Sequence, residues 1–214
     1  MKKNVMMASS ALALVMSVSV FAGGPDEGES SLVVGSSGTW YAGVVGGVSM
    51  LGGDLAKDSS FTPTVTTTFS DVTSTGYDLG FTLGYALNTH FSAEGQALFV
   101  ENSGKDGATG KASEWVFMGN VKYAFAMGNA ITPYVGAGFG YMSPDDYDDT
   151  DGFTHDGKVA YQAIVGIDYA LNPYMDLLLD YHFVGPIGSQ DVDGETTVYL
   201  PLMHLINIGF NYKF

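Results

Sequence analysis

The chain has 214 residues, enough for one domain, and carries 23 acidic residues against eight basic ones. This balance argues against binding to nucleic acid and against docking on anionic lipid through a basic patch. The sequence contains no cysteine, which excludes a disulfide framework and a thiolate metal site and suits export through an oxidising compartment.

The first 22 residues are organised as a secretory signal peptide. Lys2 and Lys3 precede an apolar stretch over residues 5–21, and Ala22 stands at the expected cleavage point. A retained transmembrane helix is the alternative, but the apolar run is short and glycine-rich sequence follows it. We therefore expect cleavage after Ala22 and a flexible periplasmic leader over residues 23–38. Loss of Lys2 and Lys3 with the signal peptide takes the formal charge from −15 to −17.

Large apolar residues alternate with small or polar ones through the rest of the chain, and this period of two predicts β-strands. In chain order, the predicted strands are 40–50, 76–87, 91–100, 114–126, 132–142, 159–171, 175–184 and 205–214. Each has about the ten residues that a tilted strand needs to cross hydrocarbon. Because eight is an even number, both ends of the predicted barrel domain, residues 39–214, lie on the same side.

Short and long connections alternate between these strands. The short turns, with Asn, Gly or Pro, are 88–90, 127–131 and 172–174, and the long polar stretches are 52–75, 101–113, 143–157 and 185–198. Outer-membrane barrels combine tight periplasmic turns with extended external loops in this way. Both ends of the domain are therefore predicted to lie in the periplasm.

The composition of the strand face opposite the large apolar residues distinguishes a membrane barrel from a soluble barrel. A soluble barrel such as a lipocalin would crowd this face with charges, but here it is mostly Gly, Ala, Ser, Thr, Asn and Gln. Small polar side chains suit the narrow lumen of eight strands. No apolar run of 18 residues follows residue 22, which rules out a helical membrane protein. We predict an all-β fold, an eight-stranded antiparallel transmembrane β-barrel with its apolar side chains facing lipid.

Aromatic residues fall where the two membrane interfaces are expected, because rings with apolar bodies and polar tips prefer the headgroup level. The predicted periplasmic girdle contains Trp40, Tyr85, Phe91, Tyr123, Phe125, Tyr169, Tyr212 and Phe214. The predicted outer girdle contains Phe99, Trp115, Phe117, Phe139, Tyr141, Tyr181 and Phe183.

Several stretches resemble strands of known outer-membrane barrels. Residues 39–43 (TWYAG) resemble the first strand of OmpA-like transmembrane barrels, and residues 133–140, 160–169 and 209–214 resemble the fifth, sixth and last strands of opacity-type barrels. The resemblance spans residues 39–214 and implies a small outer-membrane barrel. It also implies that Phe210, Tyr212 and Phe214 form the assembly signal read by the barrel-assembly machinery.

The chain departs from this family in two places. His182 stands between two aromatics where the family often has Arg, and the chain ends at Phe214 without the peptidoglycan-binding domain of full-length OmpA. We therefore do not expect it to tether the cell wall.

A group of titratable residues falls on the predicted inner face, and we treat it as a lumen charge network. Its members are Glu94, Lys122, Asp168, Asp176, Asp180, His182 and Lys213. Charges in a narrow interior need partners, since an unpaired one costs several kcal/mol. Glu94 with Lys122, and Asp176 with Lys213, lie on neighbouring strands at similar heights. The network either plugs the barrel or gates it for small ions, and the narrowness of eight strands favours the plug.

The acidic stretch 143–156 is the candidate for a cation site. Its aspartates suit calcium, but Tyr147 and Lys158 stand where a calcium loop needs acids. A solvated acidic loop is therefore favoured, and weak divalent bridging to lipopolysaccharide stays open.

An enzyme of this class would need a Ser or Asp nucleophile beside a His base near the outer leaflet. His90 and Ser92 lie in a predicted periplasmic turn, His155 lies in a predicted external loop, and His204 lies near the outer rim with no Ser partner. We expect no catalytic residue, no metal site and no cofactor.

The sequence thus predicts a non-enzymatic outer-membrane surface barrel that supports envelope integrity. Its loops, above all the Thr- and Ser-rich stretch 52–75, offer surfaces for interaction or adhesion. The alternative is a narrow, gated, porin-like channel for small solutes or cations. The expected partners are outer-membrane lipid and lipopolysaccharide, the barrel-assembly machinery and ligands on host or other cell surfaces.

Overall fold

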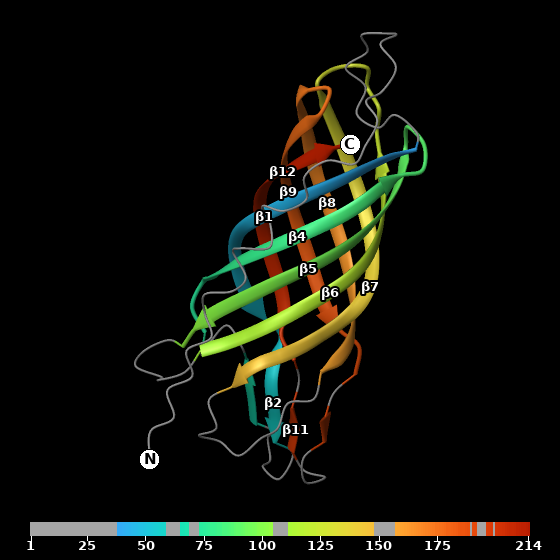
Figure 1. The fold of residues 1–214 in the computed structure, drawn as a ribbon. Coiled ribbons are helices and arrows are strands. Elements are labelled where there is room, and N and C mark those ends of the chain that lie inside the picture. The colour runs from blue at the N-terminus through green and yellow to red at the C-terminus, as the bar shows by residue number, and fades with distance from the viewer. Residues whose placement is uncertain are drawn as a thin grey trace, which may run out of the picture.

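The computed structural model describes residues 38–58, 65–68, 73–104, 111–147, 157–188, 190–191, 196–198 and 200–214. Eight antiparallel strands close into a barrel in the order β1-β12-β9-β8-β7-β6-β5-β4 (Figure 1). These strands are β1 (Thr39–Gly52), β4 (Gly76–Ala86), β5 (Phe91–Ser103), β6 (Lys111–Ala124), β7 (Ile131–Tyr147), β8 (Lys158–Asn172), β9 (Met175–Pro186) and β12 (Leu202–Lys213). The predicted eight-stranded antiparallel barrel is confirmed. The predicted signal peptide and all but the last residue of the predicted leader lie outside the described residues.

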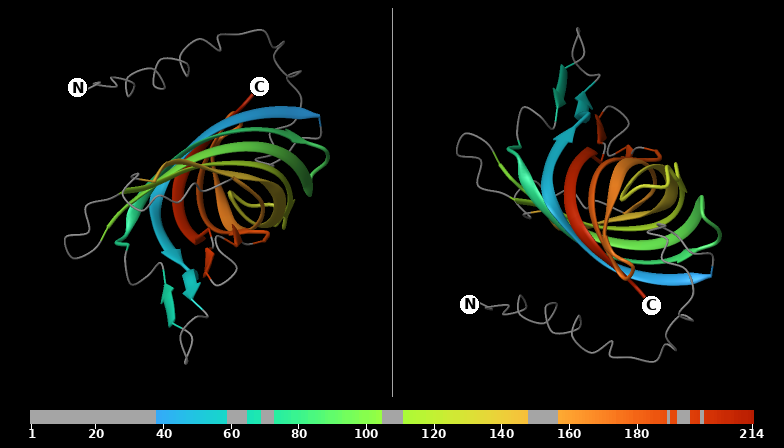
Figure 2. Two further views of the ribbon diagram at one scale, coloured as in Figure 1. Left: turned by 90° about the horizontal axis from the view of Figure 1, so that it is seen from below. Right: turned by 90° about the horizontal axis from the view of Figure 1, so that it is seen from above.

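The first and last strands close the barrel. β1 pairs with β12 from Tyr41 opposite Lys213 to Gly52 opposite Leu202, and with β4 on its other side. The two views of Figure 2 show the strands winding around one central axis. Because closure pairs both edges of the sheet, the backbone hydrogen bonds of the barrel strands are met within the barrel, as a hydrocarbon environment requires.

Burial alternates along each barrel strand, as the period of two predicts. On β12, Ile206, Ile208 and Phe210 are exposed, whereas Asn207 and Asn211 between and beside them are buried. The other strands expose further large apolar side chains, among them Leu79 and Phe139. This inside-out distribution matches a barrel whose outer surface meets acyl chains. No helix in the described part of the chain is long and apolar enough to cross a bilayer.

Asparagine side chains shape the three short turns. The carboxamide oxygen of Asn88 accepts hydrogen bonds from the backbone N–H groups of His90 and Phe91, at 2.8 Å each. Asn129 and Asn172 accept the same kind of bond from residues two positions ahead. Such turns satisfy backbone donors where the ladder ends, which explains why these connections are tight.

A second sheet corrects the prediction for two of the long connections. Within stretches 52–75 and 185–198, predicted as loops, lie β2 (Asp54–Asp58), β3 (Val65–Thr68), β10 (Gln190–Asp191) and β11 (Thr196–Val198). They pair in the order β10-β11-β2-β3, and Figure 1 shows β2 and β11 beyond the end of the barrel opposite the C-terminus. Each strand is too short for its own alternation to be recognised, because its stability depends on pairing with a distant segment.

Candidate functional site in the barrel lumen

Inward-facing side chains fill the lumen. A polar layer lies toward the short turns, an apolar layer follows it along the barrel, and further buried polar side chains, among them Ser49, Asn102 and Glu114, lie at the long-loop end. The apolar cluster consists of Val45, Leu51, Leu98, Val100, Val116, Met118, Met142, Ala160, Leu178, Val184, Leu200, Met203 and Leu205. Leu98, Met142 and Met203 are fully buried.

The apolar layer corrects the prediction that small hydrophilic groups fill the whole lumen. In a barrel of eight strands the inward side chains contact one another rather than water, so apolar groups are stable there. Around Leu98 and Val116 both faces of the strand are apolar, and the alternation between faces therefore carries little contrast in sequence. Which apolar side chains point inward follows only from the register of the strands.

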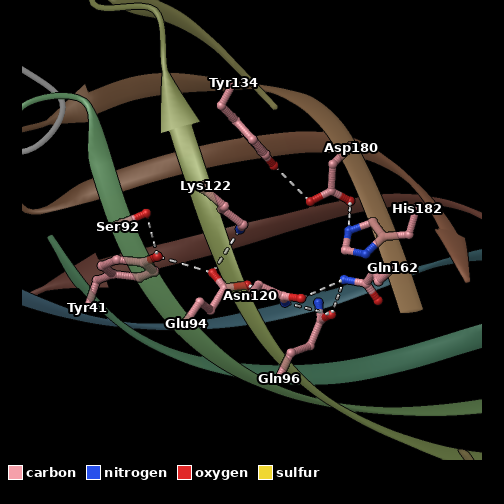
Figure 3. Close-up of polar contacts among 10 residues, drawn as sticks. All are labelled: Tyr41, Ser92, Glu94, Gln96, Asn120, Lys122, Tyr134, Gln162, Asp180 and His182. Atoms are coloured by element: carbon pink, nitrogen blue, oxygen red, sulfur yellow. Dashed lines mark hydrogen bonds and ion pairs between the residues drawn. The ribbon is translucent and has the colours of Figure 1, made fainter. Parts of the chain in front are cut away.

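An ion pair stands at the centre of the polar layer (Figure 3). Lys122 Nζ on β6 lies 2.8 Å from Glu94 Oε2 on β5, and these two side chains are 11% and 0% exposed. Tyr41 on β1 donates its hydroxyl to the same carboxylate oxygen at 3.2 Å. Lys122 Nζ also lies 5.0 Å from the ring centroid of Tyr134. The two opposite charges thus meet in a closed environment that stabilises the pair only while both are present.

Three side-chain amides extend this network across the lumen. Gln162 Nε2 on β8 donates to Gln96 Oε1 on β5 at 3.0 Å and to Asn120 Oδ1 on β6 at 3.3 Å. In the barrel order β6 and β7 separate β5 from β8, so the bond between the two glutamines is a chord across the interior. Figure 3 shows these amides pointing toward one another from different strands.

A second carboxylate cluster lies beside the first. Asp180 Oδ1 is 2.9 Å from His182 Nε2, and Tyr134 donates its hydroxyl to Asp180 Oδ2 at 2.9 Å. Asn207, with its amide nitrogen turned toward the carboxylate, donates to Asp78 Oδ1 at 2.7 Å. His182, which stands where the resembled family often has Arg, is fully buried and forms an ion pair with Asp180 when protonated.

A small recess opens at the short-turn end of the lumen. It encloses about 70 Å³, space for a few water molecules. Lys213 Nζ lies 2.8 Å from Asp176 Oδ2 in its wall, and Asp168 lines it as well. Among the described residues Asp168 has no hydrogen-bond or ion-pair partner within contact distance. The recess is thus lined by two carboxylates, Asp168 and Asp176, and two lysines, Lys122 and Lys213, and Lys122 is paired with Glu94.

All seven residues of the proposed lumen charge network thus lie inside the barrel, six of them in direct pairs. The network has further members that the sequence did not predict, which are Tyr41, Asp78, Gln96, Asn120, Tyr134, Gln162 and Asn207. A usable signal existed for the two tyrosines, because each stands directly opposite a glycine. Tyr41 faces Gly84 and Tyr134 faces Gly166, and a Cβ on either glycine would collide with the tyrosine ring.

The remaining predicted sites have separate positions. Phe210, Tyr212 and Phe214 lie on the outward face near the C-terminus, all exposed. His90 lies in the turn between β4 and β5, where its ring is 3.0 Å from the hydroxyl of Thr89. His155 and most of the acidic stretch 143–156 lie outside the described residues, and no side chain is described for residues 144–147.

Comparisons with known proteins agree with this architecture. The family described as outer membrane protein beta-barrel domain matches residues 8–214. The outer membrane protein OprG from Pseudomonas aeruginosa is 19% identical with a TM-score of 0.55, and covers 83% of this chain and 97% of its own. Neisserial surface protein A is 15% identical with a TM-score of 0.55, and covers 83% of this chain and 98% of its own.

The outer membrane protein AlkL, solved in DMPC bilayers, is 15% identical with a TM-score of 0.54, and covers 91% of this chain and 97% of its own. At these identities the likeness shows a shared fold. No curated protein sequence matches the chain.

Proposed function

The chain belongs to the outer membrane protein β-barrel domain family, and we propose that it acts as a non-enzymatic surface barrel that supports the integrity of the outer membrane. In this proposal the barrel is a membrane-embedded support, its lumen is closed, and its long connections carry the surface that contacts the outside. We further propose that it is of the opacity type.

The filled lumen is the observation that carries the proposal. Leu98, Val116 and Met142 come from three strands and are buried in one apolar cluster. In the polar layer, the bond between Gln96 and Gln162 crosses the interior. Water and ions would have to displace both layers to pass, and removing a buried ion pair's partner costs several kcal/mol. The geometry therefore favours a closed barrel.

The sheet of β10, β11, β2 and β3 supports a role for the loop end in surface contact. It joins two connections that lie far apart in sequence, β11 pairing with β2. A paired sheet presents a more rigid surface than independent loops, and rigid scaffolds with exposed connections are where binding surfaces arise. Lipopolysaccharide, bridged by divalent cations to the acidic connections, and ligands on host or other cell surfaces are the partners we propose.

Export and assembly complete the proposal. We propose that the signal peptide is removed after Ala22 and that the barrel-assembly machinery reads Phe210, Tyr212 and Phe214. These three aromatics alternate on the outward face of the last strand segment, where a partner strand or protein can reach them before insertion.

A gated channel for small cations is the second candidate, and the recess favours it. The recess opens at the short-turn end, Lys122 of the Glu94–Lys122 pair lines it, and Asp168 adds a carboxylate that has no ion-pair partner among the described residues. In this alternative, separation of the ion pair would open the polar layer. The apolar layer would still lie in series with it.

Planar-bilayer recording of the purified, folded mature chain separates the two functions. The closed-barrel proposal predicts no unit currents for the natural chain or for Lys122→Met. It also predicts none for the double variant Leu98→Ala/Met142→Ala. The apolar layer stays closed in Lys122→Met, and the polar layer stays closed in the double variant. Reproducible unit currents from the natural chain would contradict the closed barrel, and currents that appear with Lys122→Met alone would establish the gate. The triple variant Lys122→Met/Leu98→Ala/Met142→Ala disturbs both layers at once and is the positive control, in which unit currents are expected.

Loss of the gene in its own bacterium tests the support role. The proposal predicts increased sensitivity to detergent and leakage of periplasmic enzymes. It also predicts that Lys122→Met, expressed at the natural level, restores the barrier. If only variants that conduct ions restored the barrier, the support role would be contradicted.

A further inference from the structure

A hydrogen-bonded imidazole stands on the outward face of the barrel near its loop end. His204 is the third residue of β12, and its Nδ1 lies 2.7 Å from the hydroxyl of Tyr181 on β9. The imidazole lies 5.2 Å, centroid to centroid, from the ring of Phe183, which in turn lies 6.1 Å from the ring of Tyr161. Aromatic rings therefore hold the imidazole in place from the side of β9 and β8.

The depth of His204 follows from the geometry of its strand. His204 shares the outward face of β12 with Ile206, Ile208 and Phe210, and the face ends with Tyr212 and Phe214. The ten residues from His204 to Phe214 span about 33 Å along the strand. A tilt of about 40° reduces this to about 25 Å across the membrane, the height of the apolar band of such barrels. If Phe214 lies at one interface, His204 lies at the other, where lipid headgroups begin.

The hydrogen bond to Tyr181 has two forms, which differ in the ring nitrogen of His204 that carries the proton, and the proposal uses the form in which the phenol donates. A phenol that donates to Nδ1 places the proton of a neutral imidazole on Nε2, and a charged imidazole also carries a proton there. Nε2–H is then a donor in both states. Gly52 on β1 is its neighbour, and a Cβ at that position would come within 3.7 Å of Nε2, so the glycine leaves this approach open. The lipid groups that accept strong hydrogen bonds at this depth are phosphates.

We propose that His204 Nε2 binds a phosphate oxygen of lipid A, with Tyr181 as its positioning residue. The proposal names the lipid partner of the surface barrel and rests on its outward orientation. It is independent of whether the lumen conducts. A single lipid held at this point fixes the loop end of the barrel to the outer leaflet on the β9–β12 side.

The test uses the mature chain, folded in a maltoside detergent that contains no phosphate and labelled with 15N at its four histidines. The probes are diphosphorylated lipid A, phosphatidylglycerol and diacylglycerol, each titrated separately. The His204 signals are assigned by their loss in His204→Phe. The proposal predicts a saturable shift of Nε2 with lipid A and none with diacylglycerol. A shift of equal size with diacylglycerol would overturn it, and so would saturation by phosphatidylglycerol but not by lipid A.

Three variants separate binding from a merely structural role. His204→Phe keeps a ring in place and is expected to weaken lipid A binding about tenfold, the value of one hydrogen bond to a charged group. Tyr181→Phe is expected to weaken it about threefold and to move the 15N shifts toward a mixture of the two imidazole tautomers. Tyr141→Phe removes a hydroxyl from a different outward tyrosine, which is exposed, and is the matched control, with no expected change.

The outcomes of the variants are equally decisive. Unchanged affinity in His204→Phe would overturn the proposal, as would equal effects of Tyr181→Phe and Tyr141→Phe. Since all three side chains face outward, folding is checked by the heat-dependent gel mobility of the barrel. Failure of this proposal would leave the conductance result untouched, so the two tests fail separately.

Discussion

Replacing Lys122 by Met tests the polar layer most sharply. The substitution keeps an unbranched side chain but removes the terminal ammonium group, so Glu94 loses its partner at 2.8 Å. Truncating one member of a buried pair costs about 3–5 kcal/mol. Glu94 keeps the hydroxyl of Tyr41 at 3.2 Å and the amide of Asn120 at 3.4 Å, two long hydrogen bonds that offset part of this cost. We therefore expect a loss of about 2–4 kcal/mol in the free energy of unfolding.

A double-mutant cycle distinguishes a lost ion pair from poor packing. Glu94→Gln alone is expected to cost about 1–2 kcal/mol, because Lys122 keeps the ring of Tyr134 beside it. The combination of Lys122→Met with Glu94→Gln leaves no buried charge at this pair. It is expected to be more stable than Lys122→Met alone by at least about 1 kcal/mol.

Urea unfolding in lipid vesicles measures these differences. The two tryptophans, Trp40 and Trp115, both carried on outward positions, report the loss of contact with lipid through their fluorescence. A cost of less than about 1 kcal/mol for Lys122→Met, or simple additivity of the two substitutions, would refute the claim that the pair stabilises the closed lumen.

Three further changes probe other parts of the account. Gly84→Ala should cost about 1–3 kcal/mol, because its Cβ would meet the ring of Tyr41, whereas Gly95→Ala, with nothing closer than 3.9 Å, should be neutral within about 0.5 kcal/mol in the same unfolding assay. Leu98→Ala should cost about 2–5 kcal/mol by leaving a cavity in the apolar layer, and equal stability to the natural chain would contradict that layer. Phe214→Ala should lower the folded yield in cells several-fold yet leave refolding of the purified chain into vesicles unchanged. A loss in both would assign it a structural role only.

The alternation of residues was sufficient to predict the barrel strands. Segments such as 76–87 have large apolar residues on one face and small ones on the other, and the structure gives β4 nearly the same limits. The short turns were equally clear, because Asn88, Asn129 and Asn172 have the local chemistry that ends a ladder. Both signals depend only on residues close together in the chain, so a single sequence is enough to recognise them.

The lumen could be predicted only in part. Glu94 and Lys122 lie on consecutive strands joined by one connection, so their proximity followed from strand order. The contact between Gln96 and Gln162 depends on the tilt and stagger of all the strands between them, which alternation does not encode. The apolar layer was not predicted, because both faces of the strand are apolar around Leu98. The sequence alone therefore does not show that Leu98 faces the lumen and not the lipid.

The short sheet beyond the barrel was unpredictable for a different physical reason. β2 and β11 pair across more than 130 positions of sequence. Neither strand has enough residues for a periodic pattern, and the Thr-rich composition of the first connection is equally typical of an irregular loop. Only the closure of β1 against β12 brings the two connections together.

Labelling of single cysteines along β12 is the most direct measurement of the central claim. Because the chain has no native cysteine, each of positions 204–212 can be replaced in turn and given a nitroxide. We predict that nitroxides at positions 206, 208 and 210 are accessible to oxygen dissolved in lipid. Position 207 is predicted to be closed both to oxygen and to a water-soluble nickel chelate. Access of the nickel chelate to position 207 would show an open aqueous lumen, and the absence of alternation would show that apolar side chains do not face the lipid.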